Sequence, residues 1–146
     1  MLMTGSPRID AERAFTRAAR ARRLGTIAQM LRGRARACAR LAVYEPRQLG
    51  GAGAAPGRRI REIPLCAISG TVEPARATLF DGAFRPAPAA RTRWQRLWLA
   101  EHRGTVLPPI SVVPAGDGYA VRDGHHRVSV ARARGALTID ATVESV

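Results

Sequence analysis

Lysine is absent from this sequence, although the chain is strongly basic. All 24 basic residues are arginine, and with 11 acidic residues they give a formal net charge of +13. The two residues are not chemically interchangeable, but the loss of every lysine from an alanine-rich chain indicates a GC-rich coding bias. An arginine at any one position is therefore weak evidence for a site that needs a guanidinium group.

Long hydrophobic runs and closely spaced cysteines are absent as well. No apolar stretch approaches the roughly 20 residues that span a bilayer, and residues 1–10 lack the apolar segment of a signal peptide. Cys38 and Cys66 stand alone, so they do not form a paired metal-ligand motif and fit a reducing compartment. We expect a cytoplasmic protein with no membrane partner.

The positive charge is concentrated in the first part of the chain. Residues 1–62 carry a net charge of +10, whereas residues 63–146 carry +3. A lopsided basic segment is typical of proteins that bind nucleic acid or another polyanion. It is also typical of a solvated helical face, and the sequence leaves both interpretations open.

Residues 1–47 are predicted to form a basic helical arm. A helix begins at Ser6-Pro7, and Gly25 either kinks it or separates it from a second helix that starts with a capping box at Thr26. The apolar face of that second part is predicted to dock on a partner surface or on the main domain. It comprises Ile27, Ala28, Leu31, Ala35, Cys38 and Leu41. The arginines that would hold a nucleic-acid backbone are Arg32, Arg34, Arg36 and Arg40.

A flexible Gly/Ala/Pro linker over 48–59 is predicted to precede a domain over 60–146. Its strands are expected over 60–68, 110–113, 119–122 and 139–143, and its helices over 87–102 and 128–134. Trp94 and Trp98 share a helical face and are expected to be core anchors, with stacking on a nucleic-acid base as the alternative. Interleaved strands and helices indicate an α+β or α/β class, and we expect an α+β fold: a small mixed sheet with packed helices.

The most informative stretch is a strand, a polar turn and a helix between Tyr119 and Gly135. Its turn reads Asp123-Gly124-His125-His126-Arg127. A glycine turn that leads into a helix N-terminus is an anion site, and an arginine there can donate two parallel hydrogen bonds to a phosphate. Asp123 could hold a Mg²⁺ ion that the phosphates share. The same residues also fit a solvated turn in which Asp123 only caps the helix.

Residues 107–143 resemble the ParB/sulfiredoxin superfamily. The resemblance rests on the run Leu107–Val113, on Gly118–Val121, on the turn Asp123–Arg127 and on the final Ile139–Val143. It implies a mixed sheet whose turn binds nucleotide phosphates. The Asp-Gly-His-His-Arg form is similar to the turn of ADP-dependent free serine kinases. Sulfiredoxin chemistry is not expected, because His125 stands where the sulfiredoxins have their reactive cysteine.

The resemblance and the turn together supply the candidate site. The phosphate-binding candidates are Gly124, His125, His126, Arg127 and Arg85, the last by analogy with the first conserved box of ParB-like domains. The catalytic candidates are Asp123, His125 and Glu73, and the metal candidate is Asp123. Glu73 is the acid nearest to where the serine kinases keep a catalytic glutamate.

Two functions of different classes follow from these residues. The first is a nucleotide-binding domain, either a switch or a small kinase or nucleotide hydrolase, that uses a nucleoside di- or triphosphate with Mg²⁺. The second is a DNA-binding accessory protein, related to chromosome partitioning, that uses the basic arm. A purely structural role is a third interpretation. The sequence leaves the oligomeric state open, including a homodimer.

Overall fold

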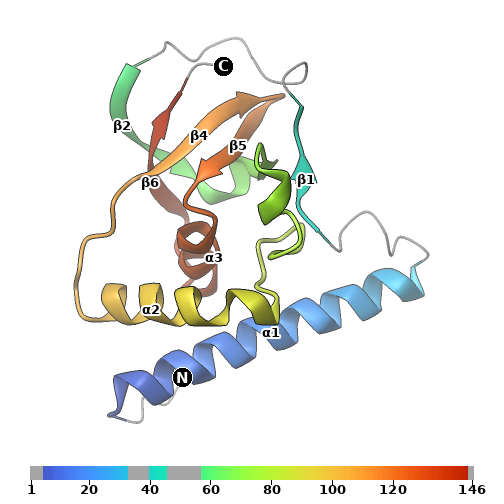
Figure 1. The fold of residues 1–146 in the computed structure, drawn as a ribbon, viewed down its shortest axis with the longest axis vertical. Helices are drawn as coiled ribbons and strands as arrows, with labels where there is room; N and C mark the ends of the chain where they lie inside the picture. The colour runs from blue at the N-terminus through green and yellow to red at the C-terminus, as the bar shows by residue number, and fades with distance from the viewer. Residues whose placement is uncertain (1–4, 33–39, 46–56, 145–146) are drawn as a thin grey trace.

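The computed structural model describes residues 5–32, 40–45 and 57–144, which form an α+β fold (Figure 1). The helices are α1 (Pro7–Leu31), α2 (Arg91–His102) and α3 (His125–Ala133). The strands are β1 (Ala42–Val43), β2 (Gly57–Pro64), β3 (Ile68–Thr71), β4 (Ile110–Ala115), β5 (Gly118–Asp123) and β6 (Thr138–Val143). Short 3-10 turns occupy Leu65–Ala67, Pro74–Arg76 and Pro88–Ala90. None of the described helices is both long enough and apolar enough to cross a bilayer.

The six strands form one mixed sheet in the order β1-β3-β5-β4-β6-β2. The predicted hairpin at 116–118 joins β4 and β5, which pair antiparallel at the centre of the sheet. β3 pairs parallel to β5, and β6 pairs parallel to β4. The short β1 belongs to the range we assigned to the arm, yet it pairs parallel to β3 at one edge. Most of the predicted linker lies outside the described residues, but 57–59 begin β2.

Helix α3 joins the sheet to the other two helices. Val128 and Ala131 pack into the core formed with the strands, whereas Val130 packs into a second cluster with α1 and α2. In that cluster Trp94 and Trp98 of α2 are buried, which confirms their predicted role as core anchors. The ring of Phe15 from α1 meets the Trp94 ring edge-on, with 5.5 Å between centroids. Figure 1 shows α1 lying along α2 on the far side from the sheet.

Three predictions about the arm are corrected by the structure. Gly25 lies inside one helix, so the alternative with a separate second helix is wrong, and Thr26 caps no helix, because its Oγ1 donates to the carbonyl of Arg22 one turn earlier. Ile27 and Leu31 are exposed, so they do not dock on the main domain, and their docking on a partner surface stays a prediction. Leu41 is buried, but it lies next to β1 rather than on a helix. Ala35 and Cys38 lie outside the described residues.

The predicted element bounds also shift. The strand expected over 60–68 ends at Pro64, and a 3-10 turn separates it from β3. The helix expected from residue 87 begins at Arg91, after a 3-10 turn. The helix expected from residue 128 begins at His125. Both histidines of the turn therefore belong to the first turn of α3 and are not on a loop.

Replacing Asp81 with alanine is expected to destabilise the fold by about 1–3 kcal/mol, the range for buried donors left unpaired. The buried Asp81 Oδ1 accepts the backbone N–H groups of Ala83 (3.0 Å) and Arg85 (2.8 Å). These bonds flank Phe84, which has a left-handed φ of 59° that bulky residues avoid. Urea unfolding measures the loss. The exposed Asp140→Ala should change stability by no more than about 0.5 kcal/mol, and an equal loss there would contradict the assignment.

Candidate functional site

Gly124 joins β5 to α3 in a conformation that other residues avoid. Its φ of 103° is left-handed, and an added Cβ would lie 2.5 Å from Cγ2 of Ile110. Both features require glycine here. The tight turn directs the first N–H groups of α3, which have no acceptor within the helix, to the end of the sheet next to β5. This confirms the predicted strand, turn and helix. Among the described residues Asp123 accepts a side-chain hydrogen bond from Arg127 and none from a backbone N–H of α3, so its predicted capping alternative is wrong.

His125 is buried at the start of α3 and held from both sides. Its Nε2 lies 2.6 Å from Oγ1 of Thr71 on β3, and its ring stacks on Phe80. Burial first, and the nearby Arg76 second, lower the pKa of His125 from 6.5 to about 4. His125 is therefore neutral at neutral pH, and its Nε2 is engaged inside the protein.

His126 is buried to the same degree but has no hydrogen-bond partner among the described residues. Its ring meets Phe80 edge-on, with 5.1 Å between centroids, and only 6% of the residue is exposed. Burial first, then Arg93 and Arg76, lower its pKa to about 4. His126 lines a pocket at the protein surface, and its ring has no hydrogen bond with the described residues that a ligand in that pocket would have to displace.

Arg127 is bound to the protein itself. Its Nη1 donates to the carbonyls of Pro108 (2.6 Å) and Pro109 (2.8 Å), and its Nη2 donates to Oδ2 of Asp123 (2.8 Å). The guanidinium therefore ties the turn to the segment that leads into β4. It holds the turn in place, and both of its terminal nitrogens are already used.

A pocket of about 160 Å³ lies at the N-terminus of α3 and brings most of the predicted site together. Its lining residues are Glu73, Arg76, Arg93, Leu97, Arg122, Asp123, Gly124, His125, His126 and Arg127. Four arginines face two carboxylates in this set, so the pocket is cationic. The helix dipole adds positive potential at the same place.

Three lining arginines were not predicted from the sequence. Arg122 is paired with Glu144. Arg76 and Arg93 are exposed, and their side chains form no hydrogen bond or ion pair with any described residue. They come from a 3-10 turn and from α2, far from the turn in sequence, so local spacing carried no signal for either.

Among the described residues, Glu73 and Asp123 are the carboxylates that line the pocket. The described residues contain no group of three or more histidine, cysteine, aspartate or glutamate side chains that could hold a metal ion. Asp123 is also engaged by Arg127. These residues fit Mg²⁺ only as an ion that phosphate oxygens help to hold, which is the usual way that Mg²⁺ binds.

The remaining predicted residues lie elsewhere. Arg85 does not reach this pocket, because its Nη1 donates to the carbonyl of Ala21 on α1 and lies 3.8 Å from Asp81. The structure therefore does not bring Arg85 together with the other phosphate-binding candidates. Arg32 and Arg40 are exposed. Arg34 and Arg36 lie outside the described residues.

Comparison with protein-family models, with curated proteins and with solved structures finds no match to this chain. The assignment of a function therefore depends on the geometry of the pocket and on the chemistry of the residues that line it.

Proposed function

We propose that the pocket at the N-terminus of α3 binds the phosphate groups of a nucleotide. The observation that carries this proposal is a pair of arginines, Arg76 and Arg93, that have no hydrogen-bond or ion-pair partner among the described residues and lie beside the buried His126. A helix N-terminus, two cations and a free imidazole together match a multiply charged, oxygen-rich anion. The helix N-terminus without these side chains would be weaker support for a phosphate site.

The size of the pocket limits what it can hold. A volume of about 160 Å³ suits one or two phosphate groups, while small-molecule sites usually enclose about 300–1,000 Å³. The sugar and base would extend outside, past Leu97 and Arg93 on α2. The resemblance of residues 107–143 to the ParB/sulfiredoxin superfamily, in which this turn binds nucleotides, favours a nucleotide over free phosphate.

The roles of the turn residues differ from those first predicted. Arg76 and Arg93 would bind the phosphates, His126 would donate from its ring, and the N–H groups of His125 and His126 would cap the anion. Arg127 would act as a positioning residue. Mg²⁺ carried by the nucleotide would neutralise phosphate charge, with Glu73 and Asp123 as its protein ligands. The proposed function is binding rather than catalysis. His125 is a catalytic candidate, but its Nε2 is already engaged by Thr71.

Arg76→Gln and Arg93→Gln are each expected to weaken nucleotide binding by about 10- to 100-fold, because a hydrogen bond to a charged group contributes about 1.5–3 kcal/mol. Calorimetry with Mg²⁺ and CTP, ATP, ADP or GTP measures the affinity, with pyrophosphate as the probe for the phosphates alone. Arg96→Gln is the matched control, because Arg96 is exposed on the same helix as Arg93 and does not line the pocket.

The proposal fails if the intact protein binds neither pyrophosphate nor any of the four nucleotides. It also fails if Arg96→Gln weakens binding as much as Arg93→Gln, since the effect would then come from net charge. If the protein bound pyrophosphate and bound no nucleotide more tightly, the pocket would be an anion site and not a nucleotide site.

DNA binding by α1 is the second candidate. Arg13, Arg17 and Arg20 are exposed and follow one another at helical spacing, on the side away from Phe15 and Ala11. Phosphate contacts by such a row would give DNA binding a steep salt dependence. In that case the double variant Arg13→Gln/Arg20→Gln would reduce the slope of log affinity against log salt concentration by about 2. Arg93→Gln would leave this slope unchanged.

A further inference from the structure

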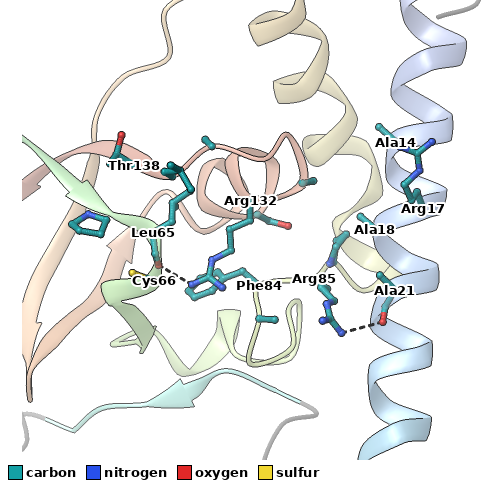
Figure 2. Close-up of a pocket in the computed structure, with 17 residues that line it drawn as sticks. Ala14, Arg17, Ala18, Ala21, Leu65, Cys66, Phe84, Arg85, Arg132 and Thr138 are labelled. Atoms are coloured by element: carbon teal, nitrogen blue, oxygen red, sulfur yellow. Dashed lines mark hydrogen bonds between the residues drawn. The ribbon is translucent and has the colours of Figure 1, made fainter. Parts of the chain in front are cut away.

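A second and larger cavity lies between α1, the segment that follows β2 and the end of α3. Its volume is about 750 Å³, and it shares no lining residue with the phosphate pocket. Figure 2 shows Ala14, Ala18 and Ala21 of α1 on one side and Leu65, Phe84 and Arg132 on the other. Cavities of about 300–1,000 Å³ with mostly apolar walls are typical of small-molecule sites.

Small residues on α1 keep this space open. Ala14, Ala18 and Ala21 follow one another at steps of four and three, so they share one face of the helix. Opposite them, Leu65, Phe84 and Leu137 supply an apolar wall. A larger residue on the α1 face would fill the cavity, which gives a direct way to test it.

The charged residues that line the cavity are all arginines: Arg17, Arg85 and Arg132. The nearest buried acid is Asp81, which lies 3.8 Å from Arg85 and interacts with Arg132 as well. Arg85 and Arg132 therefore share one carboxylate, and this pair keeps an excess of positive charge.

Arg132 has unused hydrogen-bonding capacity. Its Nη2 donates to the carbonyls of Leu65 (2.8 Å) and Ile68 (3.2 Å), and its guanidinium lies 5.2 Å from the centre of the Phe84 ring. Its Nε is buried without a partner, and its Nη1 forms no hydrogen bond with any described residue. A cation held over an aromatic ring at the edge of an apolar cavity is a suitable partner for a single anionic group.

We propose that this cavity binds a small molecule with an apolar body and one carboxylate group, with the carboxylate on Arg132 and Arg85. The apolar walls disfavour a ligand with several charges, because each further charge would lose its hydration. Ser129 adds a polar contact: its Oγ accepts a hydrogen bond from Nε1 of Trp94 and keeps its own proton to donate. This site is independent of the proposed phosphate pocket.

Calorimetric titration of the full chain with octanoate tests the proposal, with 1-octanol and octylammonium as probes of the same chain length. Octanoate should bind about 10-fold or more tightly than octanol, and octylammonium should not bind. Ala21→Phe should weaken octanoate binding by about 10-fold or more by filling the cavity. Arg132→Met should remove the preference for octanoate over octanol while leaving octanol binding.

Ala28→Phe is the matched control, because Ala28 is exposed on α1 and does not line the cavity. It should leave octanoate binding unchanged. Tighter binding in this variant would indicate attachment to the exposed apolar end of α1 and would overturn the proposal. Equal affinity for octanoate and octanol, no binding of octanoate, or full binding by a folded Ala21→Phe protein would each overturn it too.

Discussion

Lowering the pH from about 7 to about 5 is expected to destabilise the fold by roughly 2 kcal/mol for each of the two buried histidines. His125 and His126 have pKa values lowered to about 4 in the folded protein, whereas an unfolded histidine titrates near 6.5. Between these values the unfolded chain binds more protons than the folded one. Stability is therefore full above about pH 6.5 and falls as the pH drops towards 4.

Urea unfolding at about pH 7, 6 and 5 measures this slope in a range where carboxylates, with pKa values near 4, contribute little. His126→Gln should remove about half of the change in unfolding free energy with pH. It should cost little stability at pH 7, because the ring has no hydrogen bond to lose among the described residues. His102→Gln is the control, since His102 stacks on Trp98 outside the pair, and this variant should keep the full slope. An unchanged slope in His126→Gln would refute the assignment.

The turn and its flanking elements were predictable from the sequence because the information is local. Gly124 is needed for the left-handed turn, and the apolar runs on either side of residues 116–118 made the hairpin evident. The α+β class followed from the same alternation of strands and helices. Trp94 and Trp98 were recognisable as core residues from helical spacing and size alone.

The rest of the site depends on contacts between distant parts of the chain. Arg93 lies on α2 and Arg76 on a 3-10 turn, and only the packed sheet brings both to α3. Arg127 looked like a phosphate ligand, but the carbonyls of Pro108 and Pro109 are its partners. Arg85 does not reach the pocket, because it lies near Asp81 and donates to a carbonyl of α1. In each case a tertiary contact decided what the side chain binds.

The continuity of helix α1 is another feature that local sequence could not predict. Glycine costs about 1 kcal/mol inside a helix relative to alanine, so a break at Gly25 was a reasonable prediction. The helix continues through it. An added Cβ there would lie 2.2 Å from Nη1 of Arg85, so Gly25 leaves room for an arginine that donates to α1. A packing contact between distant segments thus explains a residue that local propensity disfavours.

Trp94→Ala is expected to cost about 3–5 kcal/mol of unfolding free energy, the range for truncating a large buried aromatic residue. Trp94 is fully buried where α1, α2 and α3 meet, against Phe15, and its Nε1 donates to Ser129 (2.9 Å). The substitution opens a large cavity and also leaves a buried hydroxyl without its donor. Urea unfolding at neutral pH measures the loss.

Two variants separate these contributions. Trp94→Phe keeps most of the apolar volume and removes the hydrogen bond, so it should cost about 1–2 kcal/mol. Leu31→Ala truncates a residue of α1 that is 84% exposed and should cost no more than about 0.5 kcal/mol. If Trp94→Ala were as mild as Leu31→Ala, then α1 would not be anchored to α2 and α3 through this cluster. The apolar cavity depends on the same docking of α1, because this helix supplies one of its walls.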